Sequence, residues 1–131
     1  MTSTFTRASV TWRRTCTATA ITGMRCSTPV ALVNYVKEKS RRHELDGAPL
    51  MRTVFSRNNP VLAFNDLADQ GDQDEQEGLM HLFEGAVLAF RNPRAHDLEP
   101  DTPEDALECI AFLSMLAKRL DQAKRRPATP P

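Results

Sequence analysis

Hydrophobic residues recur at helical spacing through most of the chain after residue 29. Val30, Val33 and Val36 stand at i, i+3 and i+6, which places them on one face of a helix of about three turns. A segment rich in Lys, Arg and Glu ends that helix. A second apolar group starts at Pro49, which suits the first turn of a short helix, and the Asn-Asn-Pro sequence at 58–60 ends it.

The clearest helical pattern covers residues 76–91. Its apolar residues form one broad face and are Leu79, Met80, Phe83, Ala86, Val87 and Phe90. Pro93 ends this helix, because a proline ring excludes the residue before it from the α region. Arg91 is therefore predicted at the helix end and His96 in the loop beyond. Within the helix, His81 is expected at the boundary of the apolar face and Glu84 in solvent.

An acidic segment precedes this helix. Residues 61–77 begin with a short apolar piece, and the carboxylates of Asp66, Asp69, Asp72, Asp74, Glu75 and Glu77 follow. We interpret the run as a solvated loop whose charge complements the dipole of the next helix. It lacks the glycine and the final glutamate of a calcium-binding loop, so no divalent-cation site is predicted there.

A final helix begins after Thr102, a good N-cap residue that Pro103 follows at the first helical position. Asp105 stands where a capping-box acid would. Cys109 lies among apolar residues of this helix and is expected to be a small buried hydrophobe. The helix ends through a basic stretch at 118–126. The patterns together predict an all-α fold, a small helical bundle with a mostly aliphatic core, since only 6% of residues are aromatic.

Residues 1–29 differ from the rest. They contain four arginines and no acidic residue, and their apolar residues follow no regular period. The chain is therefore divided into an irregular or disordered leader at 1–29, a helical domain at 30–124 and a Pro-rich tail at 125–131. The leader's composition suits an organelle transit peptide, but its weak amphipathicity favours a disordered or wrongly translated segment instead.

Composition excludes several function classes. There is no P-loop, GxGxxG, GxSxG or HExxH motif, and no His or Cys pair with metal-ligand spacing, so neither a metal nor a cofactor is expected. No apolar run is long enough for a membrane span and no secretory signal opens the chain, which makes the cytoplasm the default location. The formal net charge is zero, so RNA as a partner would require a local basic patch.

The candidate chemistry lies at the end of the 76–91 helix. Arg91 and His96 are the candidate catalytic pair, and Asn92 and Arg94 are the supporting, phosphate-binding residues. A histidine that titrates near neutral pH takes the proton of an RNA 2′-hydroxyl, and an arginine stabilises the charge on the phosphate. No metal is needed, because the nucleophile belongs to the substrate. The spacing alone is a weak signal, because an arginine at a helix C-terminus and a loop histidine on the surface are its commoner explanation; the position between two amphipathic helices favours the functional interpretation.

The run GLMHLFEGAVLAFRNPRAH, followed by EDALECIAFLSMLAKRLDQA, resembles the Ymh-type family of uncharacterised bacterial proteins, which is grouped with the HEPN superfamily. The resemblance covers about residues 30–124. The HEPN signature is an arginine, a polar residue that is often asparagine, and a histidine four to six positions after the arginine. Arg91, Asn92 and His96 match that signature.

The resemblance implies a HEPN-like helical bundle and an endoribonuclease with a toxin or phage-defence role. It also implies a homodimer in which two Arg–His motifs face each other, and a partner protein from a defence system. Two alternatives remain open: a non-catalytic module that binds RNA or nucleotide or pairs with another protein, and a truncated, inactive remnant. The remnant is considered because family members usually have a further amphipathic helix before Val30, which residues 1–29 do not show.

Overall fold

The computed structural model describes residues 28–91 and 102–127 of the chain. The helices in these ranges are α2 (Thr28–Ser40), α3 (Gly47–Val54), α4 (Gln70–Ala86) and α6 (Pro103–Gln122), and α4 continues directly into a π-helix, η1 (Val87–Arg91). Two short strands, β1 (Leu62–Ala63) and β2 (Lys124–Arg125), form one antiparallel pair. The predicted all-α bundle is confirmed. Of the leader predicted at 1–29, residues 1–27 lie outside the described residues, and the last two belong to α2.

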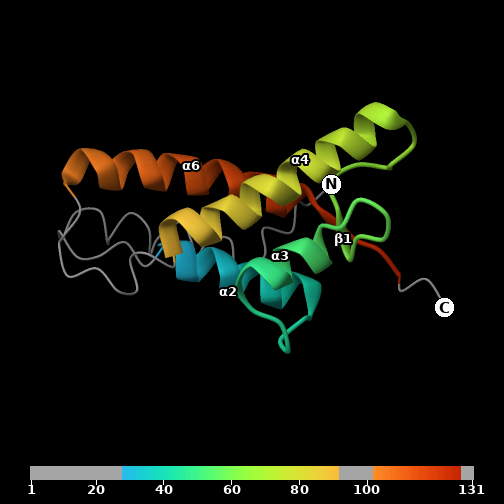
Figure 1. Cartoon of the computed structure of the whole chain (residues 1–131), viewed down its shortest axis with the longest axis horizontal. Coiled ribbons are helices and arrows are strands. Elements are labelled where there is room, and N and C mark those ends of the chain that lie inside the picture. Colours follow the sequence, from blue (N-terminus) through green and yellow to red (C-terminus); the bar gives the residue numbers. More distant parts are fainter. Residues whose placement is uncertain (1–27, 92–101, 128–131) are drawn as a thin grey trace, which may run out of the picture.

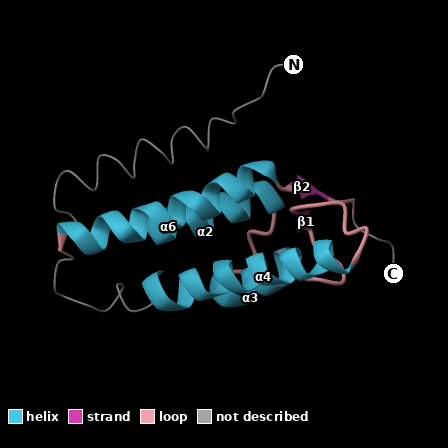
Figure 2. Ribbon diagram, turned by 90° about the horizontal axis from the view of Figure 1, so that it is seen from above, coloured by secondary structure: helices cyan, strands magenta, loops and turns pink. Residues whose placement is uncertain are grey.

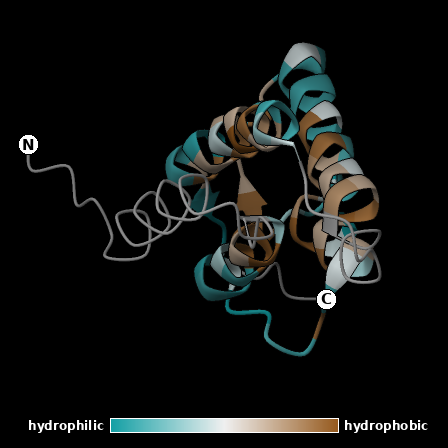
Figure 3. Ribbon diagram, turned by 90° about the vertical axis from the view of Figure 1, so that its left-hand side faces the viewer, coloured by the Kyte–Doolittle hydropathy of each residue, from teal (hydrophilic) through white to brown (hydrophobic). Residues whose placement is uncertain are grey.

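The helices pack as two pairs around a shared core. α6 lies along α2, and α4 lies along α3, as the two perpendicular views show together (Figures 1 and 2). Seen from the end of the bundle, the hydrophobic faces of the helices turn toward one another and the hydrophilic faces turn outward (Figure 3). This is the arrangement that amphipathic helices reach when each must bury one apolar stripe.

The core is aliphatic around a small aromatic cluster. Phe55 and Phe83 are fully buried, their ring centroids 4.6 Å apart, and Phe64 stacks on Phe55 at 5.0 Å. Leucines and valines of α2, α3 and α6 belong to the same core, as does Cys109, which is buried as predicted. The three rings come from the end of α3, the segment just after β1, and α4.

The acidic segment is only partly a loop, which corrects the prediction. α4 begins at Gln70, several residues before the predicted start, so that Asp72, Asp74 and Glu75 belong to its first turns. Asp69 is the N-cap, and its side chain accepts a hydrogen bond from the backbone N–H of Asp72 at 2.9 Å. The carboxylates do complement the helix dipole, but they do so from within the helix.

α6 begins as its sequence predicts. The Oγ1 of Thr102 accepts from the backbone N–H of Asp105 at 3.2 Å, and the same hydroxyl donates to the carboxylate of Asp105 at 2.7 Å. Pro103 occupies the first helical position, where its missing N–H has no intrahelical partner to lose.

α2 ends in an unusual turn. Arg41 follows its last residue with a φ of 58°, a left-handed conformation that usually belongs to glycine and costs other residues about 1 kcal/mol. Ser40 fixes the turn, because its buried Oγ donates to the carbonyl of Val36 at 2.6 Å and accepts from the N–H of Arg42 at 3.3 Å.

One buried side chain organises the irregular segment between α3 and α4. Gln76 is fully buried in α4, and its Oε1 accepts from the backbone N–H of Phe64 at 3.0 Å. Its Nε2 donates to the carbonyls of Phe55 at 3.2 Å and Leu62 at 3.0 Å. The amide therefore satisfies backbone groups that would otherwise be buried without partners.

The end of the described chain returns to this segment. Leu62 pairs with Arg125 and Ala63 with Lys124, and the N–H of Arg126 donates to the carbonyl of Val61 at 2.9 Å. The basic residues after α6 were predicted as a fraying helix end. The structure instead places Lys124 and Arg125 in a strand, because β1 offers them backbone hydrogen-bond partners.

Replacement of Gln76 by alanine should lower the free energy of unfolding by about 2–4 kcal/mol, because it leaves buried backbone groups unsatisfied. Gln73→Ala, one turn earlier on the same helix, is the matched control and should change stability by less than about 0.5 kcal/mol. Urea unfolding monitored by circular dichroism measures both. Equal stability of the two variants would contradict the role given to Gln76.

Candidate functional site

The candidate motif begins at the last residue of η1. The helix predicted for residues 76–91 is helical throughout, but its final five residues, Val87–Arg91, adopt the π form. Such segments make i→i+5 hydrogen bonds, are rare, and are found frequently at functional sites. They also change the direction in which the following residues leave the helix.

The π-helix is anchored by packing on both sides. Val87 is buried in the core, and the ring of Phe90 packs against Phe112 of α6 with centroids 5.8 Å apart. η1 also contacts α2 and α3. The backbone of Arg91 is thereby positioned at one end of the bundle, where α2 and α6 begin (Figure 1).

The remaining predicted site residues, Asn92, Arg94 and His96, lie outside the described residues. No distance between the candidate arginine and histidine follows from the structure, and their pairing stays a prediction. The described chain resumes at Thr102, which caps α6. The motif therefore lies in the connection between two packed helices, as its sequence context indicates.

A second polar group, which the sequence did not predict, joins α3 to α4. Glu84 forms an ion pair with the Nε of Arg52 at 3.2 Å and lies 3.6 Å from the Nδ1 of His81. The Glu84 side chain is only 17% exposed, so the expectation that it lies free in solvent is wrong. His81 is the exposed member, with 61% of its side chain accessible, rather than a residue at the apolar boundary. We interpret this group as an interhelical ion-pair network.

The described residues contain no other recognisable catalytic constellation. Among residues 28–91 and 102–127, no group of three His, Cys, Asp or Glu side chains is placed to hold a metal ion. Within the same ranges, no helix combines the length and the apolar character needed to cross a bilayer.

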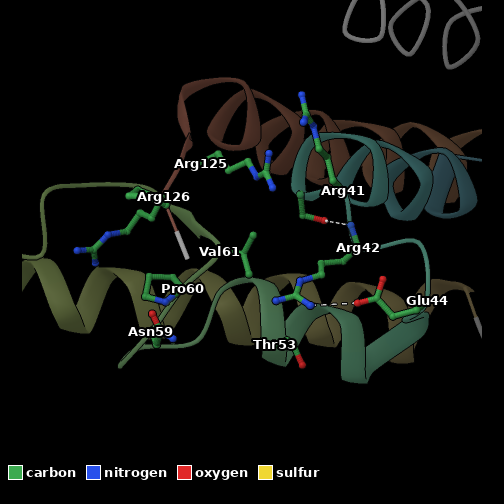
Figure 4. A pocket seen from close by; sticks show the side chains of 11 residues that line it. Arg41, Arg42, Glu44, Thr53, Asn59, Pro60, Val61, Arg125 and Arg126 are labelled. Carbon is green, nitrogen blue, oxygen red and sulfur yellow. Dashed lines mark hydrogen bonds and ion pairs between the residues drawn. The ribbon is translucent and has the colours of Figure 1, made fainter. Parts of the chain in front are cut away.

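A cleft lies at the opposite end of the bundle. Its volume is about 490 Å³, and four arginines line it, Arg41 and Arg42 after α2 and Arg125 and Arg126 in and after β2 (Figure 4). Sequence patterns missed it because they assigned each Arg-Arg pair separately to a polar helix end. The pairing of Leu62 with Arg125 fixes the second arginine pair beside the 59–61 segment of the cleft, and no local signal in the sequence predicts that pairing.

A comparison with protein families identifies the chain's relatives. Residues 26–120 match the model of a family described as "Protein of unknown function (Hypoth_ymh)". Neither the curated proteins nor the solved structures gave a match.

Proposed function

The chain belongs to the Hypoth_ymh family, and for this member we propose metal-independent cleavage of RNA of the HEPN type, in a toxin or phage-defence role. The observation that carries the proposal is the position of Arg91. It ends a π-helix that packing fixes on the bundle, and Asn92, Arg94 and His96 follow within five residues along the chain.

The proposed reaction uses groups of the substrate and of this chain. His96 removes the proton of a 2′-hydroxyl, and the 2′-oxygen forms a bond to the adjacent phosphorus. The bond from phosphorus to the 5′-oxygen breaks, which leaves a 2′,3′-cyclic phosphate and a 5′-hydroxyl once that oxygen takes up a proton. Arg91 stabilises the additional negative charge on the phosphate oxygens, and Asn92 and Arg94 assist in binding them.

We further propose that two copies of the chain form the working unit. Large apolar side chains are exposed at the end of the bundle where Arg91 lies: Val30 in the first turn of α2, Leu88 in η1 and Leu107 near the start of α6, which is 62% exposed. A surface of this kind favours association. In such a dimer, His96 of the partner subunit would be available to protonate the leaving 5′-oxygen.

His96→Ala should reduce the rate of RNA cleavage in EDTA by at least about 100-fold, the usual contribution of a general acid–base group. Purified protein is incubated with single-stranded and structured RNA, and the products are resolved on a denaturing gel. His81→Ala is the matched control, because His81 is an exposed histidine of the preceding helix, and it should cleave at the wild-type rate.

No cleavage by a folded wild-type dimer would refute the nuclease proposal. Retained RNA binding in that case would favour the non-catalytic module instead. Cooperative unfolding of the wild-type protein in a circular-dichroism melt excludes an unfolded remnant as the cause.

Two variants of Arg91 should separate the contribution of its charge to cleavage from that of its bidentate geometry. Arg91→Ala is expected to reduce cleavage by about 100-fold or more, whereas Arg91→Lys should retain part of the activity, since lysine keeps the charge but loses the bidentate fork. Single-turnover rates at saturating protein measure the chemical step. Equal, wild-type rates for both variants would show that Arg91 does not contact the reacting phosphate.

Leu107→Glu should weaken the proposed dimer, because it places a charge in the exposed apolar surface. Light scattering after gel filtration should then report a monomer, together with slower cleavage. Met115→Glu is the control, since Met115 is an exposed apolar residue of the same helix two turns further along. A wild-type protein that is monomeric at all concentrations would contradict the dimer.

A further inference from the structure

We propose that the arginine-lined cleft at the far end of the bundle binds the phosphate backbone of an RNA strand. Its lining comes from four segments: the end of α2 with the turn after it, Thr53 of α3, the 59–61 segment before β1, and residues 125–127. In Figure 4 the side chains of Arg42 and Arg125 reach into the space between these segments, while that of Arg41 extends upward and that of Arg126 to the left, away from it. The identification of the polymer as RNA rests on the proposed function.

Specific contacts within the fold hold the segments that carry the cleft arginines in place. Lys39 reaches from α2 to the C-terminus of α6, where its Nζ donates to the carbonyls of Leu120 and Asp121. Burial lowers the pKa of Lys39, and the nearby Asp121 opposes that shift. The hydroxyl of Tyr35 donates to the Asp121 carboxylate. The ends of α2 and α6 are thereby held together, and the chains that leave them supply the two arginine pairs.

The charge in the cleft is almost uncompensated. The four arginines are exposed, and the one acid in the lining, Glu44, is bound to Arg42 at 3.1 Å. A backbone hydrogen bond and the contact with Arg42 lower the pKa of Glu44, which keeps it ionised. In the described part of the chain, no carboxylate pairs with Arg41, Arg125 or Arg126. The whole chain has equal numbers of acidic and basic residues, so this local excess is a specific feature.

The chemistry of the lining favours a polymer backbone over a small phosphorylated ligand. A site for a free nucleotide would be expected to stack its base on an aromatic ring, and the lining contains none. The cationic groups are exposed and come from separated segments, which suits repeated phosphates along a strand. Arginine binds phosphate oxygens bidentately, so each guanidinium is able to hold one phosphate.

The cleft and the candidate active end lie at opposite ends of the bundle, with α2 between them (Figures 1 and 2). α2 has 13 residues and is therefore about 20 Å long. A strand of a few nucleotides spans that distance. An RNA strand that is bound in the cleft and runs along the bundle would reach the end where Arg91 lies.

The test measures binding of a single-stranded RNA oligonucleotide whose 2′-positions are all methylated, which keeps the phosphates and removes the nucleophile. Fluorescence anisotropy of the full chain gives the affinity over a series of salt concentrations. Loss of each phosphate contact should reduce the slope of log K against log salt by about 0.7. We expect a reduction of about 1.4 for Arg125→Ala/Arg126→Ala and about 0.7 for Arg41→Gly.

Two controls separate binding from folding. Arg119→Ala removes an exposed arginine of α6 that pairs with Glu75 outside the cleft, and should leave the slope unchanged. Arg41→Gly should not lower the melting temperature, because glycine accepts the left-handed conformation. Weaker RNA binding by a variant that is as stable as the wild type therefore supports a direct contact.

The inference would be overturned if the wild-type chain did not bind RNA, or if the cleft variants kept the wild-type slope. It would also be overturned if a polyglutamate peptide displaced the RNA as well as inorganic triphosphate does at the same charge concentration. A different result would refute the proposed function. Since the methylated RNA cannot be cut, normal binding together with absent cleavage of unmodified RNA would refute the nuclease and leave the cleft assignment intact.

Discussion

The side-chain amide of Gln76 makes three hydrogen bonds to the backbone of the irregular segment between α3 and α4, and these bonds fix that segment against α4. The consequences extend beyond the segment itself. Leu62, whose carbonyl one of these bonds holds, pairs with Arg125 in the two-stranded sheet. The sheet in turn attaches the chain after α6 to the rest of the bundle. One buried polar residue thereby determines where two of the four cleft arginines lie.

Regular helices were largely predictable from the sequence. The period of the apolar residues located all four α-helices, and Thr102 with Pro103 marked the start of α6 because capping is a local effect. The start of α4 was missed, since its first turns carry acidic residues and no apolar stripe, and their helical form depends on the Asp69 cap and on the buried Gln76. The strands were missed for a related reason: two-residue strands have no period, and only tertiary contact creates them.

The two candidate sites differ in how far local sequence identifies them. Arg91 and His96 stand close in the chain around a predicted helix end, and their spacing together with the family resemblance was enough to propose them. The structure adds the π-helix and the Phe90–Phe112 contact that fix the first residue of the motif. The arginine cleft joins residues more than 80 positions apart, and it became visible only when the coordinates placed both chain segments together.

The π-helix affects how the direction of the motif could change in evolution. A π-turn contains one residue more than the α-turn it replaces, and Leu88 and Ala89 in η1 are both exposed. Removing one such residue would restore an ordinary helix and rotate everything after it by about 100° without disturbing the buried side chains before it. A one-codon deletion in η1 would thus reorient the motif, and it would also move Phe90 from its contact with Phe112 of α6.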